Sequence, residues 1–462
     1  MKNSIKRMFW LISLMFFLVI IWLGKLAIID RDELRTNSYN PRMQYSDSTI
    51  KRGSIKDING EILAESQKTD DGYVRKYPRS RMAGHVTGYS SKGKTGVEAV
   101  ENFELENIQN EVVQRITNAF TGEDVKGNDV VLTIDMDIQS VAGDLLGDQK
   151  GAIVVMEPTT GRVLAMQSYP DFDPNTVSDD WQELKADEDS PLINRTTQGL
   201  YPPGSTFKIV TALAGMEYVP DLASFTVECT GEDEFENKVI HCYNDKAHGT
   251  VDIYKAMEQS CNCYFAELGK IIGGQNLRTV ADRLGINSNL GLELPSSKSS
   301  VSINGNSTES ELVETAIGQG KTIVTPMYMA TLISAVANGG NMKVPYIVDH
   351  IEDYKGEVSN ITLPKTSSQI MTLDEAKELT EMMIGVVNNG TGKQASVKGY
   401  QVAGKTGTAE NSTGIDHSWF VGFAPAENPK VAVAVVLENA EGNKRATPIA
   451  GKLIKAYLDK YE

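Results

Sequence analysis

Three short motifs, far apart in the sequence, constrain how this chain of 462 residues can fold. The first is Ser205-Thr206-Phe207-Lys208 (S-x-x-K), the second is Ser260-Cys261-Asn262 (S-x-N), and the third is Lys405-Thr406-Gly407 (K-T-G). They hold hydroxyl, amine and amide groups, which can activate and position one another only within hydrogen-bond reach. The sequence therefore predicts a fold that gathers three distant segments into one site.

Local context separates these motifs from chance copies of the same patterns. The copies are residues 48–51 and 91–94 for S-x-x-K, 38–40 and 302–304 for S-x-N, and 94–96 for K-T-G. Residues 201–204, Tyr-Pro-Pro-Gly, form a turn, and residues 205–216 after it are apolar at helical spacing. Ser205 should therefore lie in the first turn of a buried helix, with Lys208 on the same face.

The third motif is expected on a β-strand, within an α+β fold. Residues 401–404 lead into Lys405 as a short apolar strand, and residues 419–424 are its expected hairpin partner. Further strands are expected at 130–134, 151–156, 162–168 and 431–437, and helices at 136–146, 325–338, 373–387 and 449–458. Antiparallel hairpins with helices grouped around them are typical of the α+β class.

The N-terminus predicts a membrane anchor. Lysine and arginine precede an uncharged run at residues 8–24, which residues 26–29 extend past Lys25. A run of this length can cross a bilayer as one helix, and Trp10 and Trp22 lie near its ends, as interfacial anchors do. Because the positive charges precede the run and acidic residues follow it, we expect a cytoplasmic N-terminus and an extracytoplasmic body. A cleaved signal peptide is the alternative, but no small-x-small cleavage site follows the run.

Charge and cysteine usage narrow the classes of partner. A net charge of -16 argues against nucleic acid binding, which needs a basic face. Cys229 and Cys242 could close a disulfide or remain free thiols, and the sequence does not choose between them. Cys261 and Cys263 lie too close in sequence to bridge each other, and Cys261 is expected to pack in the core. The cysteines and five histidines show no spacing typical of zinc sites, so we expect no metal ion and no cofactor.

The residue types of the first two motifs predict acyl transfer through a serine. A serine hydroxyl needs a base within hydrogen-bond reach, and no histidine is placed to serve, so Lys208 is the expected base for Ser205. A lysine with its usual pKa is protonated, so Lys208 must be desolvated or lie beside another cation, such as Lys405. Ser260 would relay a proton to the leaving amine, and Asn262 would hold a substrate amide.

The strand of the third motif is expected to bind the substrate. Lys405, Thr406 and Thr408 would bind a substrate carboxylate, and Gly407 would let the strand backbone approach the substrate closely. The backbone amides of Ser205 and Thr408 are the expected oxyanion donors. Two residues near the motif, His417 and Trp419, are candidates to line the groove, whereas Arg195 is expected to be structural.

The motifs and their surroundings resemble those of class B penicillin-binding proteins, the membrane-anchored D,D-transpeptidases of bacterial cell-wall synthesis. The resemblance extends to residues 52–64 (R-G-x-I, N-G and L-A), 95–98 (T-G-x-E), 151–174, 318–320, 325–326 and 337–340. It covers most of the chain from Arg52 onward, with Ile58 where an arginine is common. The family's catalytic signatures match Ser205 and Lys208, Ser260 and Asn262, and the K-T-G at 405–407.

The resemblance implies a pedestal followed by a penicillin-binding domain built on an antiparallel sheet flanked by helices. With the apolar run, it divides the chain into a cytoplasmic tail (1–7), a transmembrane helix (8–29), a pedestal (30–127) and a transpeptidase domain (128–462). It implies that Ser205 forms an acyl-enzyme on the D-alanyl-D-alanine end of peptidoglycan stem peptides, which the amine of a neighbouring stem resolves. β-Lactams would acylate the same serine, and a separate membrane glycan polymerase is the implied partner. Division, elongation and sporulation all stay open as cellular roles.

A P-loop match offers an alternative from another class. Residues 88–95 fit G-x-x-x-x-G-K-T, the pattern of nucleotide-hydrolysing proteins. A P-loop needs a buried strand before its first glycine and a helix that begins at its lysine. Residues 81–87 form only a weak strand by pattern, and Gly96 interrupts the start of the helix, so we expect a glycine- and serine-rich turn.

Related activities on the same site would differ in how the acyl-enzyme is resolved. In a D,D-carboxypeptidase or a β-lactamase, water would resolve the acyl-enzyme, and in a β-lactam sensor it would hardly be resolved. A catalytically inactive scaffold is the structural alternative. The intact Ser205, Lys208, Ser260 and Lys405 argue against it.

Overall fold

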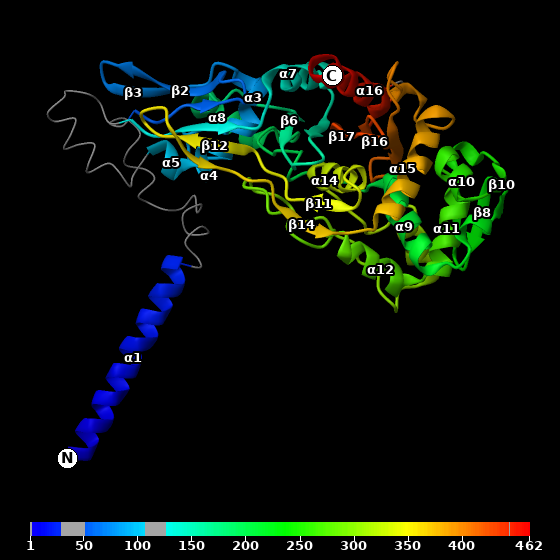
Figure 1. The fold of residues 1–462 in the computed structure, drawn as a ribbon, viewed down its shortest axis with the longest axis horizontal. Helices are drawn as coiled ribbons and strands as arrows, with labels where there is room; N and C mark the ends of the chain where they lie inside the picture. The colour runs from blue at the N-terminus through cyan, green and yellow to red at the C-terminus, as the bar shows by residue number, and fades with distance from the viewer. Residues whose placement is uncertain (1, 29–50, 107–125, 443) are drawn as a thin grey trace.

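The computed structural model describes residues 2–28, 51–106, 126–442 and 444–462. Helix α1 (Lys2–Ile28) contains the apolar span Ile5–Lys25, which has a mean hydropathy of 2.1 and no buried residue (Figure 1). Among the described helices, α1 alone is long and apolar enough to cross a membrane. It fits a single-pass membrane protein, and the other described segments form the folded body.

A five-stranded antiparallel sheet forms the centre of the body. Its strands lie in the order β15 (Ala403–Ala409), β16 (His417–Ala424), β17 (Val431–Leu437), β5 (Gly151–Met156) and β6 (Val163–Tyr169). Every residue of β17 is buried, and its side chains alternate between two hydrophobic cores. The continuous apolar run at 431–437 therefore results from a strand that is covered on both faces.

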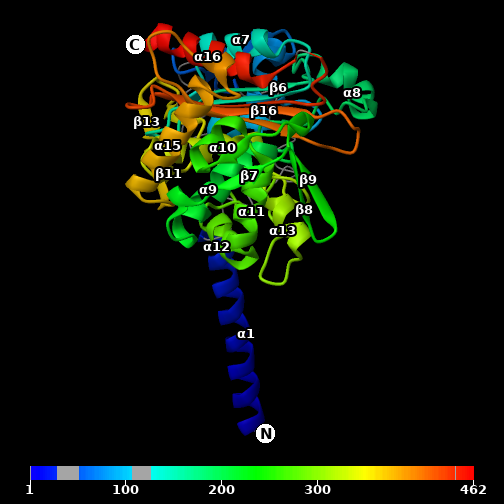
Figure 2. The ribbon, with the colours of Figure 1, turned by 90° about the vertical axis from the view of Figure 1, so that its right-hand side faces the viewer.

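Helices cover both faces of this sheet (Figures 1 and 2). Helices α7 (Met136–Leu146) and α16 (Ala446–Tyr461) pack on one face, and α14 (Pro326–Ala337) packs on the other. The Asp135 carboxylate accepts from the Asp137 amide to cap α7, while Thr325 caps α14 ahead of a proline at its first turn. These elements confirm the predicted α+β class.

A helical lobe lies beside the β15 edge of the sheet. It contains α9 (Lys208–Tyr218), α10 (Ile253–Gln259), α11 (Asn262–Ile272), α12 (Gly274–Arg283), α13 (Glu309–Ala316) and α15 (Leu373–Asn388), which appear below the sheet in Figure 2. Two small hairpin-like sheets extend the lobe: β7 (Val227–Cys229) pairs with β10 (Gly249–Val251), and β8 (Glu232–Phe235) pairs with β9 (Lys238–His241).

A second sheet joins the N-terminal region to later parts of the chain. Its order is β13 (Val358–Ile361), β12 (Val348–Glu352), β4 (Asp129–Leu132), β1 (Ile55–Lys56), β2 (Ile62–Thr69) and β3 (Gly72–Lys76). Strand β1 is antiparallel to β2 and parallel to β4, which in turn pairs with β12. The pairing thus crosses the domain boundary predicted between residues 127 and 128, and that boundary stays a prediction. Remaining elements are α3 (Ser80–Thr87), α4 (Gly96–Val100), α5 (Asn102–Glu106), α8 (Val177–Ala186), and the pair β11 (Asn341–Lys343) and β14 (Thr366–Gln369).

A buried ionic cluster holds the N-terminal region together. Arg52 and Arg75 bind the two carboxylate oxygens of Glu98, each at 2.6 Å, and Arg52 also reaches Glu106 at 2.8 Å. Burial alone would raise the pKa of Glu98, but the two arginines hold it at about 2. The R-G-x-I and T-G-x-E segments are therefore partners in one cluster.

The P-loop alternative does not fit this region. Segment 88–95 follows a helix, α3, so the prediction of a weak strand at 81–87 is wrong. The lysine of the pattern, Lys94, is buried, and its Nζ donates to Glu106 at 2.7 Å and to Asn102 at 2.8 Å. Because protein side chains already surround this amine, the segment is a structural turn and not a phosphate-binding loop.

Candidate active site

The nucleophile candidate Ser205 lies in a tight turn before a buried helix. Gly204–Phe207 form one turn of 3₁₀ helix, which continues into α9, so the predicted helix begins slightly later than expected. Gly204 has φ +52°, and a Cβ there would lie 2.4 Å from the Thr408 carbonyl oxygen. The Gly204 amide also donates to the Gly318 carbonyl at 2.9 Å. The turn is therefore fixed between the third motif and the segment at 318–320.

The second motif lies at the junction of two helices. Ser260 ends α10 in the left-handed conformation (φ 56°, ψ 42°), and Cys261 is the N-cap of α11. This places the Ser260 hydroxyl at the cleft and directs the Asn262 side chain toward Lys208. Asn262 also donates through Nδ2 to the His241 carbonyl at 2.7 Å, which ties the motif to the strand β9.

Two buried lysines converge on Ser260. Lys208 Nζ donates to the Ser260 carbonyl and to Asn262 Oδ1, both at 2.7 Å, and lies 3.4 Å from Ser260 Oγ. Lys405 Nζ donates to Ser260 Oγ at 2.9 Å and to the Thr406 carbonyl at 3.0 Å. The hydrogen bonds of Lys208 Nζ in the described structure go to the second motif and not to the Ser205 hydroxyl one turn away.

Burial lowers the pKa of both lysines. The pKa of Lys208 falls to about 8 because its ammonium group is desolvated. Lys405 has a pKa well below its ordinary value, first because of burial and then because of the Lys208 charge. The sequence offered two causes for a low pKa at Lys208, desolvation or a neighbouring Lys405 charge. Desolvation is the cause in the structure, and the like-charge effect instead lowers the pKa of Lys405. Repulsion between like charges is mutual, so the pair titrates as a unit.

The third motif forms the free edge of the central sheet. Among the strands that the structure describes, β15 pairs with β16 alone, with Lys405 opposite Val421 and Gly407 opposite Trp419. A Cβ at Gly407 would lie 2.9 Å from the Trp419 Cβ and 3.0 Å from the Pro203 carbonyl oxygen. The glycine thus allows the strand to pack against the nucleophile turn, a role that differs from the substrate approach expected from the sequence.

The three motifs border one cleft of about 1020 Å³. Its lining includes Ser205, Ser260, Asn262, Thr406, Gly407 and Thr408, while Lys208 and Lys405 lie fully buried behind it. His417 and Trp419 also border the cleft, as predicted. Trp419 is fully buried, and its Nε1 donates to the Pro202 carbonyl at 3.0 Å, so it supports the turn before Ser205.

Several supporting residues could not be identified from the motifs. Glu438 accepts from the Tyr201 hydroxyl at 2.6 Å and from Arg195 Nε at 2.8 Å, which anchors the segment before Ser205 to the end of β17. The expectation that Arg195 is structural agrees with this contact. Thr391 shares a 2.6 Å hydrogen bond with the Thr406 hydroxyl. These residues come from segments whose spacing carries no signal, so only the fold brings them to the site.

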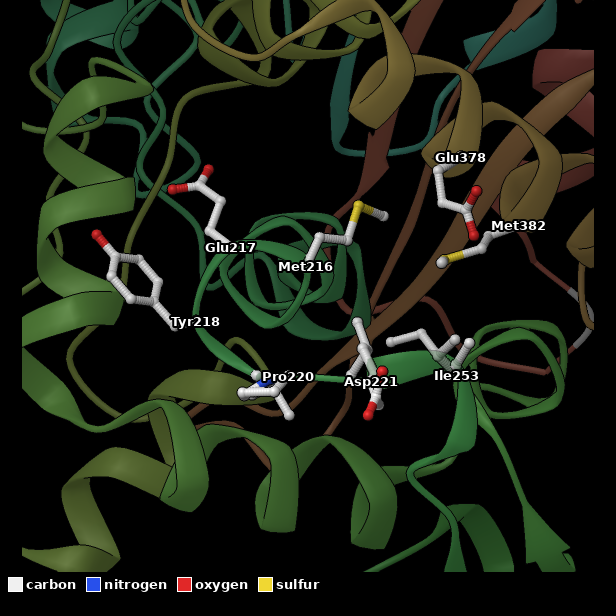
Figure 3. Close-up of a pocket in the computed structure, with 11 residues that line it drawn as sticks. Met216, Glu217, Tyr218, Pro220, Asp221, Ile253, Glu378 and Met382 are labelled. Carbon is white, nitrogen blue, oxygen red and sulfur yellow. The ribbon is translucent and has the colours of Figure 1, made fainter.

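The four cysteines are free and buried. Cys229 Sγ and Cys242 Sγ lie 3.6 Å apart, so the disulfide left open by the sequence is not formed. A smaller cavity of about 390 Å³ lies at the end of α9 and is lined by Met216, Tyr218, Ile253, Glu378 and Met382, among others (Figure 3). None of its lining residues belongs to the three motifs.

Comparisons with known proteins agree with this site. A family described as the penicillin binding protein transpeptidase domain matches residues 151–455, and one described as the penicillin binding protein A dimerisation domain matches residues 52–130. The chain is 31% identical over 497 residues to the peptidoglycan D,D-transpeptidase PbpA of Mycolicibacterium smegmatis, covering 99% of each chain.

Solved structures give the same result. The imipenem acyl-enzyme of penicillin-binding protein A from M. tuberculosis is 32% identical, with a TM-score of 0.84, over 89% of this chain and 99% of that one. The D,D-transpeptidase domain of a peptidoglycan glycosyltransferase from Eggerthella lenta is 34% identical, with a TM-score of 0.81 and the same coverage. The chain therefore belongs to the penicillin-binding proteins that carry a dimerisation domain followed by a transpeptidase domain.

Proposed function

We propose that this protein is a peptidoglycan D,D-transpeptidase that works through an acyl-enzyme on Ser205. The observation that carries the proposal is the meeting of the three motifs at Ser260, whose hydroxyl lies 2.9 Å from Lys405 Nζ and 3.4 Å from Lys208 Nζ. The serine of the first motif lines the same cleft. Relatives that are named peptidoglycan D,D-transpeptidases, and neighbours solved as β-lactam acyl-enzymes, support it.

Lys208 serves as the base in this proposal. A neutral lysine amine has two N–H donors and one lone pair. The Ser260 carbonyl and Asn262 Oδ1 can take both donors at 2.7 Å, and the lone pair would then accept from the Ser205 hydroxyl in place of the long 3.4 Å contact with Ser260 Oγ. Burial supplies the neutral form, because it lowers the lysine pKa to about 8.

The reaction then follows in two steps. Lys208 accepts the Ser205 proton as Oγ bonds to the carbonyl carbon of the penultimate D-alanine, and the bond to the terminal D-alanine nitrogen breaks. Ser260 passes its proton to that leaving amine and takes up the proton that Lys208 accepted, so Lys208 is neutral again. The amine of a second stem peptide then attacks the ester, and Ser205 regains its proton as the cross-link forms.

The free edge of β15 is the proposed substrate platform. An unpaired strand edge presents N–H and C=O groups that an extended peptide can join. Thr406 and Thr408 lie on this strand at the cleft and, with Lys405, would bind the substrate carboxylate. The amides of Ser205 and Thr408 are the proposed oxyanion donors, since Gly204 packs directly against Thr408.

The membrane context is also a proposal. We place the N-terminus in the cytoplasm and the cleft outside the cell, because the basic residues at the start of α1 precede its uncharged run at 8–24 and acidic residues follow the helix. A membrane glycan polymerase is the proposed partner, since cross-linking needs newly made glycan strands. Copurification from detergent-solubilised membranes would test that partner, and recovery of the full chain without any polymerase would argue against it.

Intact-mass spectrometry of the full chain in detergent tests the acyl-enzyme. With penicillin, wild type should gain the mass of one drug molecule, and Ser205→Ala should gain none. Rapid drug turnover without an adduct would point to a β-lactamase, and no reaction in either protein would support the inactive scaffold. A cross-linking assay with stem-peptide donors then separates transpeptidation from carboxypeptidation by its product, a dimer or a shortened monomer.

A further inference from the structure

Four sulfur and nitrogen ligand atoms lie together directly behind the second motif. Cys229 Sγ, Cys242 Sγ, Cys261 Sγ and a ring nitrogen of His248 all lie within 4.8 Å of one another. The three cysteines are 0–2% exposed, and His248 is half-buried at the rim of the cleft. They come from four separate segments of the chain, so no pair of them has the C-x-x-C spacing that would mark a site in the sequence.

Three of the six separations between these atoms are close to the edges of a small tetrahedron, and all six are within 4.8 Å. Cys229 Sγ lies 3.6 Å from Cys242 Sγ and 3.4 Å from His248 Nδ1, and Cys242 Sγ lies 3.9 Å from Cys261 Sγ. A tetrahedral zinc ion with bonds of 2.3 Å to sulfur and 2.0–2.1 Å to nitrogen gives edges of about 3.8 Å between sulfurs and about 3.6 Å between sulfur and nitrogen. A disulfide would need about 2.05 Å.

We propose that Cys229, Cys242, His248 and Cys261 bind one structural Zn²⁺ ion. Three thiolates and one imidazole form a complete tetrahedral set, with no position left for water, and soft sulfur ligands select zinc over the hard cations. Cys263 Sγ lies 3.6 Å from Cys242 Sγ but is outside the set of four mutually close atoms, so it is a neighbour and not a ligand. The sequence spacing predicted no metal ion, whereas the positions of these four side chains in the fold favour one.

The backbone of the small sheets preorganises the ligands. Cys229 ends β7 and His248 immediately precedes β10, and the His248 amide donates to the Cys229 carbonyl at 3.1 Å. Cys242 follows β9, and its amide donates to the Gly231 carbonyl at 2.8 Å. The Tyr264 amide donates to Cys261 Sγ at 3.5 Å, as amides commonly do to metal-bound thiolates.

The ion would fix the position of Ser260 and Asn262. Cys261 is the central residue of that motif, and Asn262 Nδ2 donates to the carbonyl of His241, the residue before Cys242. Zinc bound to both cysteines would thus hold the motif at two points, through the backbone of Cys261 and through the Asn262 side chain. This effect on catalysis rests on the proposed function, whereas the metal assignment does not.

Metal analysis of the full chain, purified in detergent without chelators or a metal-affinity tag, tests the site. We expect about one zinc per chain in wild type, in Cys263→Ser and in Ser205→Ala, and less than about a tenth of that in Cys229→Ser. Cys263→Ser is the matched control, because it removes a buried thiol from the same cluster without removing a ligand. Ser205→Ala separates the two proposals, since it should keep zinc and lose penicillin acylation.

A chelator experiment on wild type needs no variant to fold. Removing zinc should slow penicillin acylation by about 10–100-fold while the thermal unfolding transition persists, and added Zn²⁺ should restore the rate. Wild type that carries no zinc, or whose intact mass shows a disulfide, would overturn the site. Zinc retained in Cys229→Ser would overturn the ligand set, and acylation unchanged by chelation would overturn the positioning role.

Discussion

Acylation of Ser205 by penicillin should depend on pH through the charge of Lys208. Burial lowers the pKa of this lysine from 10.5 to about 8. Only the neutral amine accepts the serine proton, so the acylation rate should rise as pH increases through the pKa. At pH 7 about 9% of such a lysine is neutral, against about 0.03% at the ordinary pKa, so burial increases the active base about 300-fold.

The variant Lys208→Arg removes the base and keeps the positive charge. A guanidinium group is not deprotonated in proteins, so this variant has no neutral form at any accessible pH. We expect acylation to slow by about 10²–10⁴-fold, the usual contribution of a positioned base. Lys238→Arg is the control, because Lys238 lines the same cleft and pairs with Glu314 at 2.6 Å on the surface.

The assay is the rate of labelling of the full chain by a fluorescent penicillin from about pH 6 to 10, with thermal unfolding as the check on folding. Lys405 shares Ser260 Oγ with Lys208, so the measured pKa belongs to the pair. The expected rise of the acylation rate with pH is unaffected, because the pKa values of both lysines are shifted downward. A rate independent of pH near neutrality, or wild-type acylation in Lys208→Arg, would refute the role of Lys208 as the base.

Two further substitutions test the supports of the site. Gly318→Ala places a Cβ 2.0 Å from the Gly204 carbonyl oxygen, so penicillin acylation should slow by about 10²-fold. Gly356→Ala is the control, because Gly356 also has a positive φ but a Cβ there has no atom within 4 Å, and this variant should acylate normally. Equal acylation rates in the two variants would contradict the role of Gly318. Arg52→Met removes one of the two cationic partners of Glu98 and of Glu106, which keep Arg75 and Lys94, and should lower the free energy of unfolding by about 1.5–3 kcal/mol in urea titrations. The exposed Arg81→Met should stay close to wild type.

Local pattern was enough to predict the central sheet and its helices. The bounds of β5, β17 and α7 agree with the expected ranges because each is a short apolar or amphipathic run that ends at clear turn or cap residues. The hairpin of β15 and β16 was predictable for the same reason. The structure of segment 81–87 could not be predicted in this way, since its mixture of polar and small residues favours neither helix nor strand. Packing against other elements selects the helix α3.

The motif residues themselves could be chosen from sequence, but their contacts could not. The S-x-x-K spacing predicts that Ser205 and Lys208 share a helix face, yet in the structure Lys208 Nζ reaches across to Ser260 and Asn262. This contact depends on how α9 packs against α11, which no local pattern encodes. The cysteine cluster was missed for the same reason, because its members lie on four separate segments that only the tertiary fold brings together.

The backbone at Ser260 explains why support is needed behind the second motif. A serine in the left-handed conformation costs about 1–3 kcal/mol, and glycine or asparagine is the usual residue at such a helix end. Glycine would remove that cost but also the hydroxyl on which Lys208 and Lys405 converge. The strained serine must therefore be held by its surroundings. Lys208 binds its carbonyl, and the proposed zinc would bind the next residue, Cys261. The central residue of this S-x-N motif, which the motif pattern does not specify, therefore has a structural role in this chain.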